Sequence, residues 1–221
     1  MIERAQVIGA GRVGSAMAAR LRERALDLSS DDPELVLLCV PDRAIAEVAA
    51  AVAPGPWIAH VSGAKPLAAL EPHRRRFGLH PLQTFTRERG AEQLDGAYAA
   101  VTAESEEAAE AGSWLARTLG LQPFALADGK RAAYHAGAAI ASNYLVTLRR
   151  AAGSLLEAAG APPEALDPLM RRTIENGFEL TGPIARGDWE TVDAHLAAIR
   201  VERPQLEPMY VALAETTKAL L

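Results

Sequence analysis

The sequence contains a single cysteine among its 221 residues, and this scarcity excludes one broad class of protein. Cys39 has no second cysteine with which to form an intramolecular disulfide, so an extracellular scaffold held by disulfides is excluded. It lies in the apolar run LVLLCV, residues 35–40, and no neighbouring residue is of a type that would lower the pKa of a thiol. We therefore interpret Cys39 as a buried, unreactive thiol.

The chain also lacks an excess of positive charge and a long apolar run. Lysine and arginine number 23 against 28 acidic residues, so nothing predicts a general affinity for nucleic acid or for an anionic membrane. The longest stretch without charge, residues 132–148, is slightly short for a membrane span and contains His135 and Asn143, so we expect a buried helix there. The N-terminal residues lead directly into a predicted strand without a signal-peptide core, and we expect a cytoplasmic protein.

Three further motifs are missing from the sequence. No spacing of Cys, His, Asp or Glu matches a metal site, and none is expected. Neither a nucleophile elbow nor a phosphate-binding lysine loop is present. His73 and His195 fall on predicted helix surfaces and receive no role.

The pattern of apolar residues divides the chain into two halves. Up to residue 127, short apolar runs alternate with helical segments, which predicts an α/β domain with a parallel sheet. From residue 128 onwards apolar residues recur at helical spacing, and this predicts an all-α domain that begins with a long helix over 129–159. The predicted domains are therefore 1–127 and 128–221. The predicted strands are 5–8, 35–40, 57–61, 77–80, 98–103 and 122–127.

A glycine motif follows the first predicted strand and opens a helix. In G-x-G-x-x-G, the first glycine makes a tight turn, the second admits a diphosphate to the backbone, and the third lets the helix pack on the strand. The alternative is a strand–helix turn that keeps its glycines for packing alone. The candidate cofactor-binding residues here are Gly9, Gly11, Arg12, Val13 and Gly14.

The next strand of such a fold is short or missing. About ten residues separate the first helix from the run at 35–40, whereas a parallel crossover needs a dozen or more. Residues 25–29 are long enough only for a short edge strand or a loop. Asp27, Asp31 and Asp32 lie at a suitable distance in sequence for a ribose contact, but the strand that would direct them is lacking. We expect NADP or NAD to bind, with weakened adenosine recognition.

Several longer motifs carry a resemblance to a known family. They are VIGAGRVGSAMA, LLCVPDRAIAEVA, HVSGA (60–64), GLHPLQTF (78–85), YHAGAAIASNYLVTL (134–148) and LTGPIARGDWETVDAHL (180–196). With them the chain resembles Rossmann-like NADP oxidoreductases that carry a C-terminal helical domain of unknown function, distant relatives of pyrroline-5-carboxylate reductase and prephenate dehydrogenase. The resemblance implies an oxidoreductase, and in the larger superfamily the helical domain pairs two subunits.

The ends of the predicted strands supply further candidates, because ligands of open parallel sheets bind at the carboxyl edge. Val40 and Pro41 are expected to line the cofactor site. Ser62 is a candidate hydrogen-bond donor to the nicotinamide or substrate, or a turn residue before Gly63. His80 is a candidate proton donor, as the similar His-Pro step of prephenate dehydrogenases suggests, or a structural histidine bonded to backbone.

The first helix of the second domain carries polar residues on one stripe. His135 and Asn143 are eight residues apart and share a face, and they are the preferred catalytic pair. Lys130 is a further candidate proton donor, although its separation from Asn143 differs from that of the lysine and asparagine in related dehydrogenases. The alternative role for each is a polar contact at a domain or dimer interface.

The loop TGPIARGD (181–188) is a candidate substrate-binding element. Thr181 and Gly182 supply flexible backbone, and Arg186 suits a carboxylate or phosphate, unless the loop is a rigid turn. The leading hypothesis is an NADP-linked oxidoreductase of a small-molecule metabolite that forms a homodimer through its C-terminal helices. The alternative is a dimeric, non-catalytic scaffold or ligand sensor with a degraded nucleotide site.

Overall fold

A computed structural model describes residues 2–29 and 31–221 of the chain. The chain forms two compact units, Met1–Ala139 and Ile140–Leu221, each of which is treated separately. The sequence-based division near residue 127 lies between the last strand and the helix that begins at Arg131, and it remains our proposal for the domain boundary.

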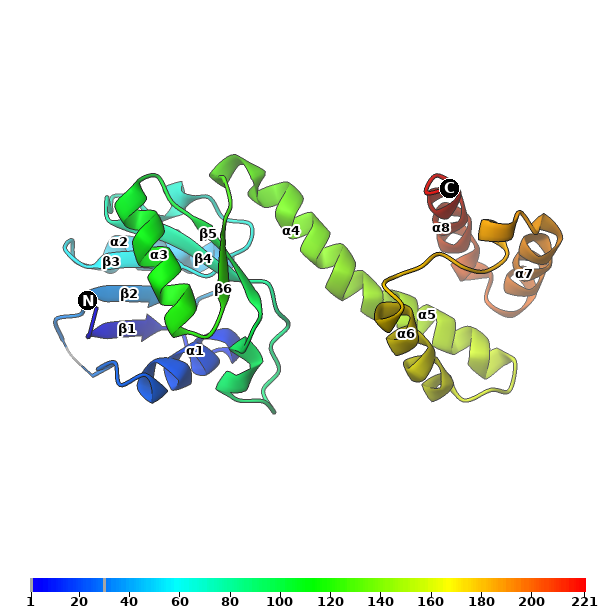
Figure 1. Cartoon of the computed structure of the whole chain (residues 1–221), viewed down its shortest axis with the longest axis horizontal. Helices are drawn as coiled ribbons and strands as arrows, with labels where there is room; N and C mark the ends of the chain where they lie inside the picture. Colours follow the sequence, from blue (N-terminus) through cyan, green and yellow to red (C-terminus); the bar gives the residue numbers. More distant parts are fainter. Residues whose placement is uncertain (1, 30) are drawn as a thin grey trace. The chain divides into compact units, whose positions relative to one another are not determined.

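A six-stranded sheet forms the centre of the first unit (Figure 1). The strands lie in the order of the sequence, and every neighbouring pair is parallel except β4–β5. The predicted α/β architecture is confirmed. The strands are β1 (Ala5–Ile8), β2 (Leu35–Leu38), β3 (Trp57–His60), β4 (Arg76–Pro81), β5 (Tyr98–Thr102) and β6 (Gln122–Ala125).

Each face of the sheet has its own apolar core. Helices α1 (Arg12–Glu23) and α3 (Glu106–Thr118) cover one face through side chains such as Met17 and Leu115. Helix α2 (Ile45–Ala51) and a 3₁₀ turn at Leu67–Leu70 cover part of the other. Because side chains alternate along a strand, β4 directs apolar residues to the first face and Gly78 and His80 to the second.

The segment that should hold a second strand retains only a trace of one. Strand β1 pairs directly with β2, with Ala5 opposite Leu35. On its other side β1 has one isolated parallel bridge, Arg4 to Asp27. The Ala5 amide donates to the Asp27 carbonyl at 2.9 Å, and the Asp27 amide donates to Glu3 at 2.9 Å. The predicted shortening is thus confirmed, and it makes β1 the edge strand of the sheet.

The antiparallel β4–β5 pair is a departure from the parallel sheet that the sequence predicts. The connection between these strands contains a 3₁₀ turn, Ala91–Leu94, in place of a crossover helix. Arg20 of α1 binds this turn, with Nη2 donating to the Ala91 carbonyl at 3.0 Å and Nη1 to Asp95 at 2.6 Å. The connection is therefore fixed on α1, and the chain re-enters the sheet in the opposite direction.

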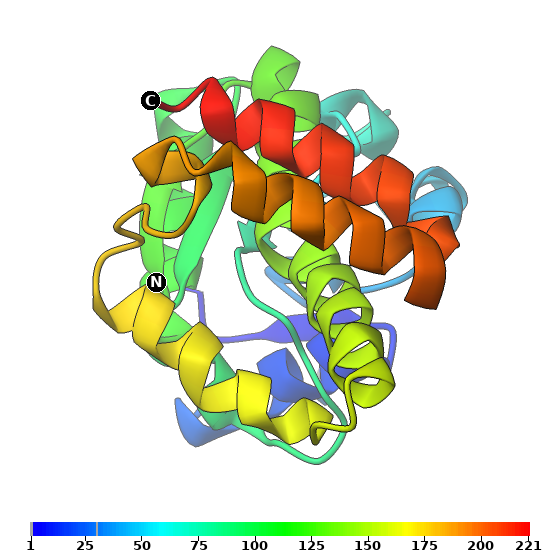
Figure 2. The ribbon, with the colours of Figure 1, turned by 90° about the vertical axis from the view of Figure 1, so that its right-hand side faces the viewer.

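The remaining chain is helical, as predicted. The long helix expected over 129–159 comprises α4 (Arg131–Ala139), a π-helical segment at Ile140–Tyr144 and α5 (Leu145–Ala158). In the second unit α7 (Trp189–Glu202) and α8 (Glu207–Lys218) lie side by side (Figure 2). In the part of the chain that the structure describes, every helix is too short or too polar to span a bilayer. Helix α6 comprises Leu166–Glu175.

One histidine assignment is wrong. His73, expected on a helix surface, is buried, and its Nε2 lies 2.8 Å from the carbonyl oxygen of Ala49. The charged residues on either side of it in the sequence gave no sign of this backbone acceptor, which belongs to helix α2. His195 does lie on an exposed part of α7, 2.8 Å from the Tyr210 hydroxyl.

Candidate functional site

Two of the three glycines in the motif are required by packing. Gly9 has a φ of 112°, and a Cβ there would collide with the carbonyl of Cys39, the residue that follows β2. A Cβ at Gly14 would collide with the carbonyl of Gly9. These two glycines hold the start of α1 close to β1 and β2.

Gly11 is different, because nothing in the described chain lies within 4 Å of where its Cβ would be. Its φ of -74° is accessible to any residue, so neither packing nor backbone conformation calls for a glycine. Helix α1 begins immediately afterwards with no side-chain cap and no acidic residue in its first turn. Uncapped amides at the start of a helix attract an anion, so the residues of this turn fit the diphosphate of a nicotinamide dinucleotide.

Two cavities adjoin the glycine turn. One, of about 450 Å³, extends along α1 and the free edge of β1. The other, of about 300 Å³, lies at the start of α1 and includes Gly11 and Arg12. The lining of the first includes Gly9, Ala10, Ser15, Ala18, Arg22 and Leu28.

The three aspartates considered for the ribose lie away from this turn. The Asp27 carboxylate accepts hydrogen bonds from the amide and hydroxyl of Ser29, at 2.8 and 2.7 Å. Asp31 and Asp32 line a separate cavity at the amino end of β1, where Asp32 lies 3.6 Å from the guanidinium of Arg4. The structure thus places no aspartate of this segment among the residues that line the two cavities beside the turn.

A second group of polar side chains surrounds His80 at the end of β4. Its Nδ1 lies 2.7 Å from the hydroxyl of Tyr134, a residue of α4. Burial lowers the pKa of His80 to about 4, and the nearby charges of His135 and Arg131 act in the same direction. Burial also raises the pKa of Tyr134 to about 12. Both groups of this hydrogen bond are therefore uncharged at neutral pH.

Gly63 allows two histidine side chains to meet. A Cβ on this residue would lie 2.6 Å from Cδ2 of His135 and 2.9 Å from Nε2 of His80. The two imidazole rings are 5.9 Å apart between centroids and nearly perpendicular. The structure thus brings together His80 and His135, two of the predicted catalytic residues, and adds Tyr134 to them.

Arg131 is a residue of this region that the sequence analysis missed. Its side chain is fully buried, with one guanidinium nitrogen donating to Thr102 Oγ1 at 2.7 Å and the other to the carbonyl of Ser62. The guanidinium lies against Gly78, where a Cβ would come within 2.9 Å of it. A basic residue in the first turn of a helix opposes the helix dipole, and that anomaly was the available signal.

His60, at the end of β3, is another buried histidine in this region. Its side chain is wholly inaccessible, and neither ring nitrogen has a hydrogen-bond partner among the described residues. Burial, reinforced by the charge of Arg131, lowers the pKa of His60 to about 4. His60 is therefore neutral at physiological pH.

The other predicted residues of the first unit occupy the same edge of the sheet or its margin. Ser62 Oγ accepts hydrogen bonds from the amides of Ala64 and Lys65, at 3.1 and 3.0 Å, which is the turn role considered for it. Val40 is half-buried and Pro41 exposed, immediately after β2. Lys130 is exposed in the 3₁₀ turn that precedes α4.

The remaining predicted residues belong to the second unit. Asn143 lies in the π-helical segment. Thr181 and Gly182 lie in the loop between α6 and α7, and Arg186 ends its 3₁₀ turn with an exposed side chain. Their roles remain predictions.

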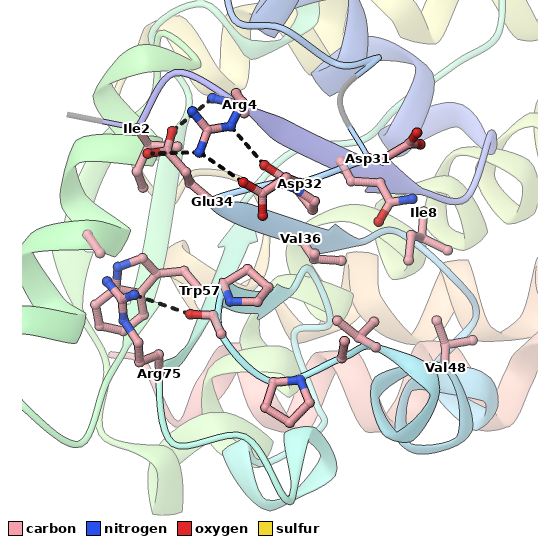
Figure 3. Close-up of a pocket in the computed structure, with 18 of the residues that line it drawn as sticks. Ile2, Arg4, Ile8, Asp31, Asp32, Glu34, Val36, Val48, Trp57 and Arg75 are labelled. Atoms are coloured by element: carbon pink, nitrogen blue, oxygen red, sulfur yellow. Dashed lines mark hydrogen bonds and ion pairs between the residues drawn. The ribbon is translucent and has the colours of Figure 1, made fainter.

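A further cavity, of about 1010 Å³, lies at the opposite edge of the sheet (Figure 3). It is lined by residues that precede the strands, such as Arg4, Glu34 and Arg75. Arg4 is paired with Glu34 at 3.6 Å, and Arg75 stacks on Trp57 at 4.7 Å from the ring centroid. Acidic residues outnumber the two arginines in its lining, and it lies away from both the glycine turn and His80.

Comparison with known proteins places this fold. The model of a family described as Domain of unknown function (DUF2520) matches residues 97–217. A search of curated proteins by sequence found no match.

Three solved structures illustrate the likeness, which at these identities concerns the fold. A protein from Bacteroides fragilis described as an NADP oxidoreductase has a TM-score of 0.81 at 21% identity, covering 99% of this chain and 98% of that one. A semialdehyde dehydrogenase NAD-binding protein from Cupriavidus necator, in complex with calcium and NAD, has 0.62 at 20%, covering 96% and 99%. The 1-pyrroline-5-carboxylate reductase of Streptococcus pyogenes has 0.63 at 15%, covering 98% and 96%.

Proposed function

The chain belongs to the DUF2520 family, and from that premise we propose that it is an oxidoreductase that transfers a hydride between a nicotinamide dinucleotide and a small-molecule metabolite. The observation that carries the proposal is Gly11, a glycine that neither packing nor backbone conformation requires, at the uncapped start of α1. The similar fold of oxidoreductases that use NADP or bind NAD supports it. The family resemblance expected from the sequence motifs is confirmed.

The chain's own residues would hold the two halves of the dinucleotide. Amides of Gly11, Arg12 and Val13 bind the diphosphate, because their N–H groups are available at the start of α1. Val40 and Pro41, which follow β2 beside Gly9, flank the nicotinamide half. When bound, the nicotinamide supplies or accepts the hydride.

Reduction of a C=O or C=N group also needs a proton donor beside the reacting heteroatom. Both groups are uncharged, and we assign the tautomer in which the Tyr134 hydroxyl donates to Nδ1 of His80 and the imidazole proton is on Nε2. That nitrogen faces Gly63 and His135. As it gives its proton to a substrate heteroatom there, the Tyr134 proton would pass to Nδ1, so the imidazole stays neutral and the negative charge rests on the Tyr134 oxygen. We assign proton transfer to His80 and His135, orientation of the substrate to Asn143, and a supporting role to Lys130.

We assign substrate binding to the loop in the second unit, where Arg186 suits a carboxylate or phosphate group.

We further propose a homodimer through the C-terminal helices, because large apolar side chains of the second unit are exposed, including Ile140 (61%) and Phe178 (71%). Light scattering should give about twice the chain mass of 23.5 kDa, and a monomer would contradict the dimer. We place the protein in the cytoplasm, in keeping with its single cysteine.

One observation favours the alternative, a non-catalytic scaffold or ligand sensor. Strand β1 has a single bridge on the side where the adenosine would bind, so the wall of an ordinary nucleotide site is reduced there. In that case the glycine turn would bind no nicotinamide dinucleotide at any useful concentration.

Substitution of Gly11 separates the two possibilities. NADPH and NADH are titrated while nicotinamide fluorescence is followed, and micromolar binding of at least one is expected. Gly11→Asp should abolish this binding, since its carboxylate caps the α1 amides and repels a diphosphate. The same substitution should not lower the melting temperature, because Asp is a preferred N-cap and meets nothing at this site.

A control variant, Ala50→Asp, adds the same charge at an exposed position of α2 and should bind like the parent protein. No binding at millimolar nucleotide, or undiminished binding by a folded Gly11→Asp variant, would contradict the proposed function.

A further inference from the structure

We propose that Arg22 of α1 binds the 2′-phosphate of NADP(H) and so makes the chain selective for NADP(H) over NAD(H). This inference rests on the proposed function and goes beyond it, because it assigns the choice of nucleotide to one side chain. The side chain lies on the first helix, whereas an ordinary fold of this type reads the ribose from the end of its second strand.

The cavity beside the glycine turn exists because that second strand is reduced. It holds about 450 Å³ and begins at Gly9 and Ala10, next to the Gly11 amide that would bind the diphosphate. It then follows the free edge of β1, and Leu28, from the remnant after the Arg4–Asp27 bridge, forms part of its wall. A dinucleotide bound at the turn therefore has space for its adenosine half along α1.

One face of α1 lines this cavity with two small residues followed by an arginine. Ser15, Ala18 and Arg22 stand three and then four residues apart, so they lie along the same side of the helix. Arg22 lies about 10 Å along the axis from Ser15, at 1.5 Å per residue. Helical side chains tilt toward the helix N-terminus, which directs the guanidinium back toward the turn. The small side chains leave the intervening space to a ligand.

The charge of the cavity favours an additional phosphate. Arg22 is the only ionisable residue among those that line the cavity in the described chain. A carboxylate that would accept a hydrogen bond from a free 2′-hydroxyl, as NAD sites have, is missing from this lining. Asp27 instead binds Ser29.

Arg22 is also available for a ligand. The nearby acidic residues Glu23 and Asp95 form ion pairs with Arg20 instead, at 2.9 Å from its Nε and 2.6 Å from its Nη1 respectively. Within residues 2–29 and 31–221 the structure gives the exposed Arg22 side chain neither an ion pair nor a hydrogen bond. A guanidinium free of protein partners retains its full fork of donors for a phosphate.

Other arginines near the turn do not explain selectivity. Arg12, Arg87 and Arg89 line the smaller cavity of about 300 Å³, which includes Gly11. Positive charge there faces the diphosphate, which NADP and NAD share, so it would strengthen the binding of both.

The test compares Arg22→Gln with Arg24→Gln, a matched change at an exposed position of the same helix end that does not line the cavity. Each protein is titrated with NADPH and NADH by nicotinamide fluorescence, and with 2′,5′-ADP and 5′-AMP by calorimetry. We expect the parent to prefer NADPH and 2′,5′-ADP by about 10- to 100-fold, a range typical of a charge-assisted hydrogen bond. Arg22→Gln should lose that preference while its NADH affinity stays within about twofold, and Arg24→Gln should retain the preference.

The outcomes separate the inference from the function on which it rests. Equal affinity of the parent for NADPH and NADH, or an equal loss of both in Arg22→Gln, would overturn the role of Arg22 and leave the oxidoreductase proposal standing. If a folded Arg22→Gln variant kept the preference for NADPH over NADH, the role of Arg22 would likewise be overturned and the oxidoreductase proposal would stand. Failure of every nucleotide to bind the parent protein would overturn both proposals.

Discussion

The hydroxyl of Tyr134 lies 2.7 Å from Nδ1 of His80, and this contact joins helix α4 to the end of strand β4. It lies within the first unit, so the position of the imidazole is set by the same domain that carries the glycine turn. His80 is held from one side by Tyr134, while Gly63 leaves its other nitrogen accessible to His135.

Tyr134→Phe should release His80 from this hydrogen bond. Loss of a partly buried hydrogen bond should lower the free energy of unfolding by about 0.5–1.5 kcal/mol. Without the hydroxyl, the proton of the imidazole is no longer directed to Nε2, and ¹⁵N NMR should show a changed tautomer ratio for His80. Tyr144→Phe, at an exposed position, is the control. Identical His80 spectra in all three proteins would contradict the arrangement.

Arg131→Met should raise the pKa of both His80 and His60, because the positive charge of Arg131 lowers the pKa of each. The variant should also lose about 1–3 kcal/mol of stability, since Thr102 and the Ser62 carbonyl lose their donor. Histidine titration by NMR measures the first effect and chemical denaturation the second. Arg117→Met, on the exposed side of α3, should change neither, and unshifted histidines in Arg131→Met would show that its charge does not reach them.

Acid should destabilise the first unit through His60. The unfolded histidine takes up a proton near pH 6.5, whereas burial lowers the pKa of folded His60 to about 4, with Arg131 acting in the same direction and Asp42 against it. Between these values the unfolded state binds more protons, so stability is lost as the pH falls from about 6.5 toward 4. His60 alone should account for about 2 kcal/mol between pH 7 and pH 5.

The matched variant His60→Leu has no proton to gain and should lose less stability over the same interval. The measurement is the free energy of unfolding by urea at pH 7 and pH 5. Equal losses in the parent and in His60→Leu would assign the acid sensitivity to other groups, such as His80.

Ala25→Gly should stabilise the protein. Ala25 has a φ of 60° directly after α1, and the Leu26 amide donates to the Leu21 carbonyl at 3.0 Å, a helix ending that glycine normally completes. Removal of the Cβ relieves the strain of this left-handed conformation, worth about 1 kcal/mol after the flexibility of glycine is subtracted. Thermal unfolding should shift upward, and Ala50→Gly, in the last turn of α2, should shift it downward.

Most of the fold follows from local pattern. The apolar runs predicted all six strands, with ends that differ from the structure by two residues or fewer. The direction of β5 was not predictable, because it depends on the attachment of the 91–94 turn to Arg20, a contact between segments 71 residues apart.

The sequence predicted several of the residues that form the candidate site, but it predicted few of the hydrogen bonds between them. The sequence identified His80 and His135 as candidates because each follows a recognisable feature, a strand end or a helix stripe. The bond between His80 and Tyr134 spans 54 residues, and the bond between Arg131 and the Ser62 carbonyl spans 69. Contacts of that range depend on how the helix packs on the sheet, and no spacing within the sequence encodes them.

The lone bridge on the outer side of β1 has a consequence for engineering this protein. An edge strand with a single bridge on its outer side pairs with an added strand more readily than a fully paired strand does. A transplanted strand and helix inserted after Ser29 would have a ready template in β1, and the register of β1 with β2 would be untouched. Such a chimera would show whether a full strand can be restored beside β1.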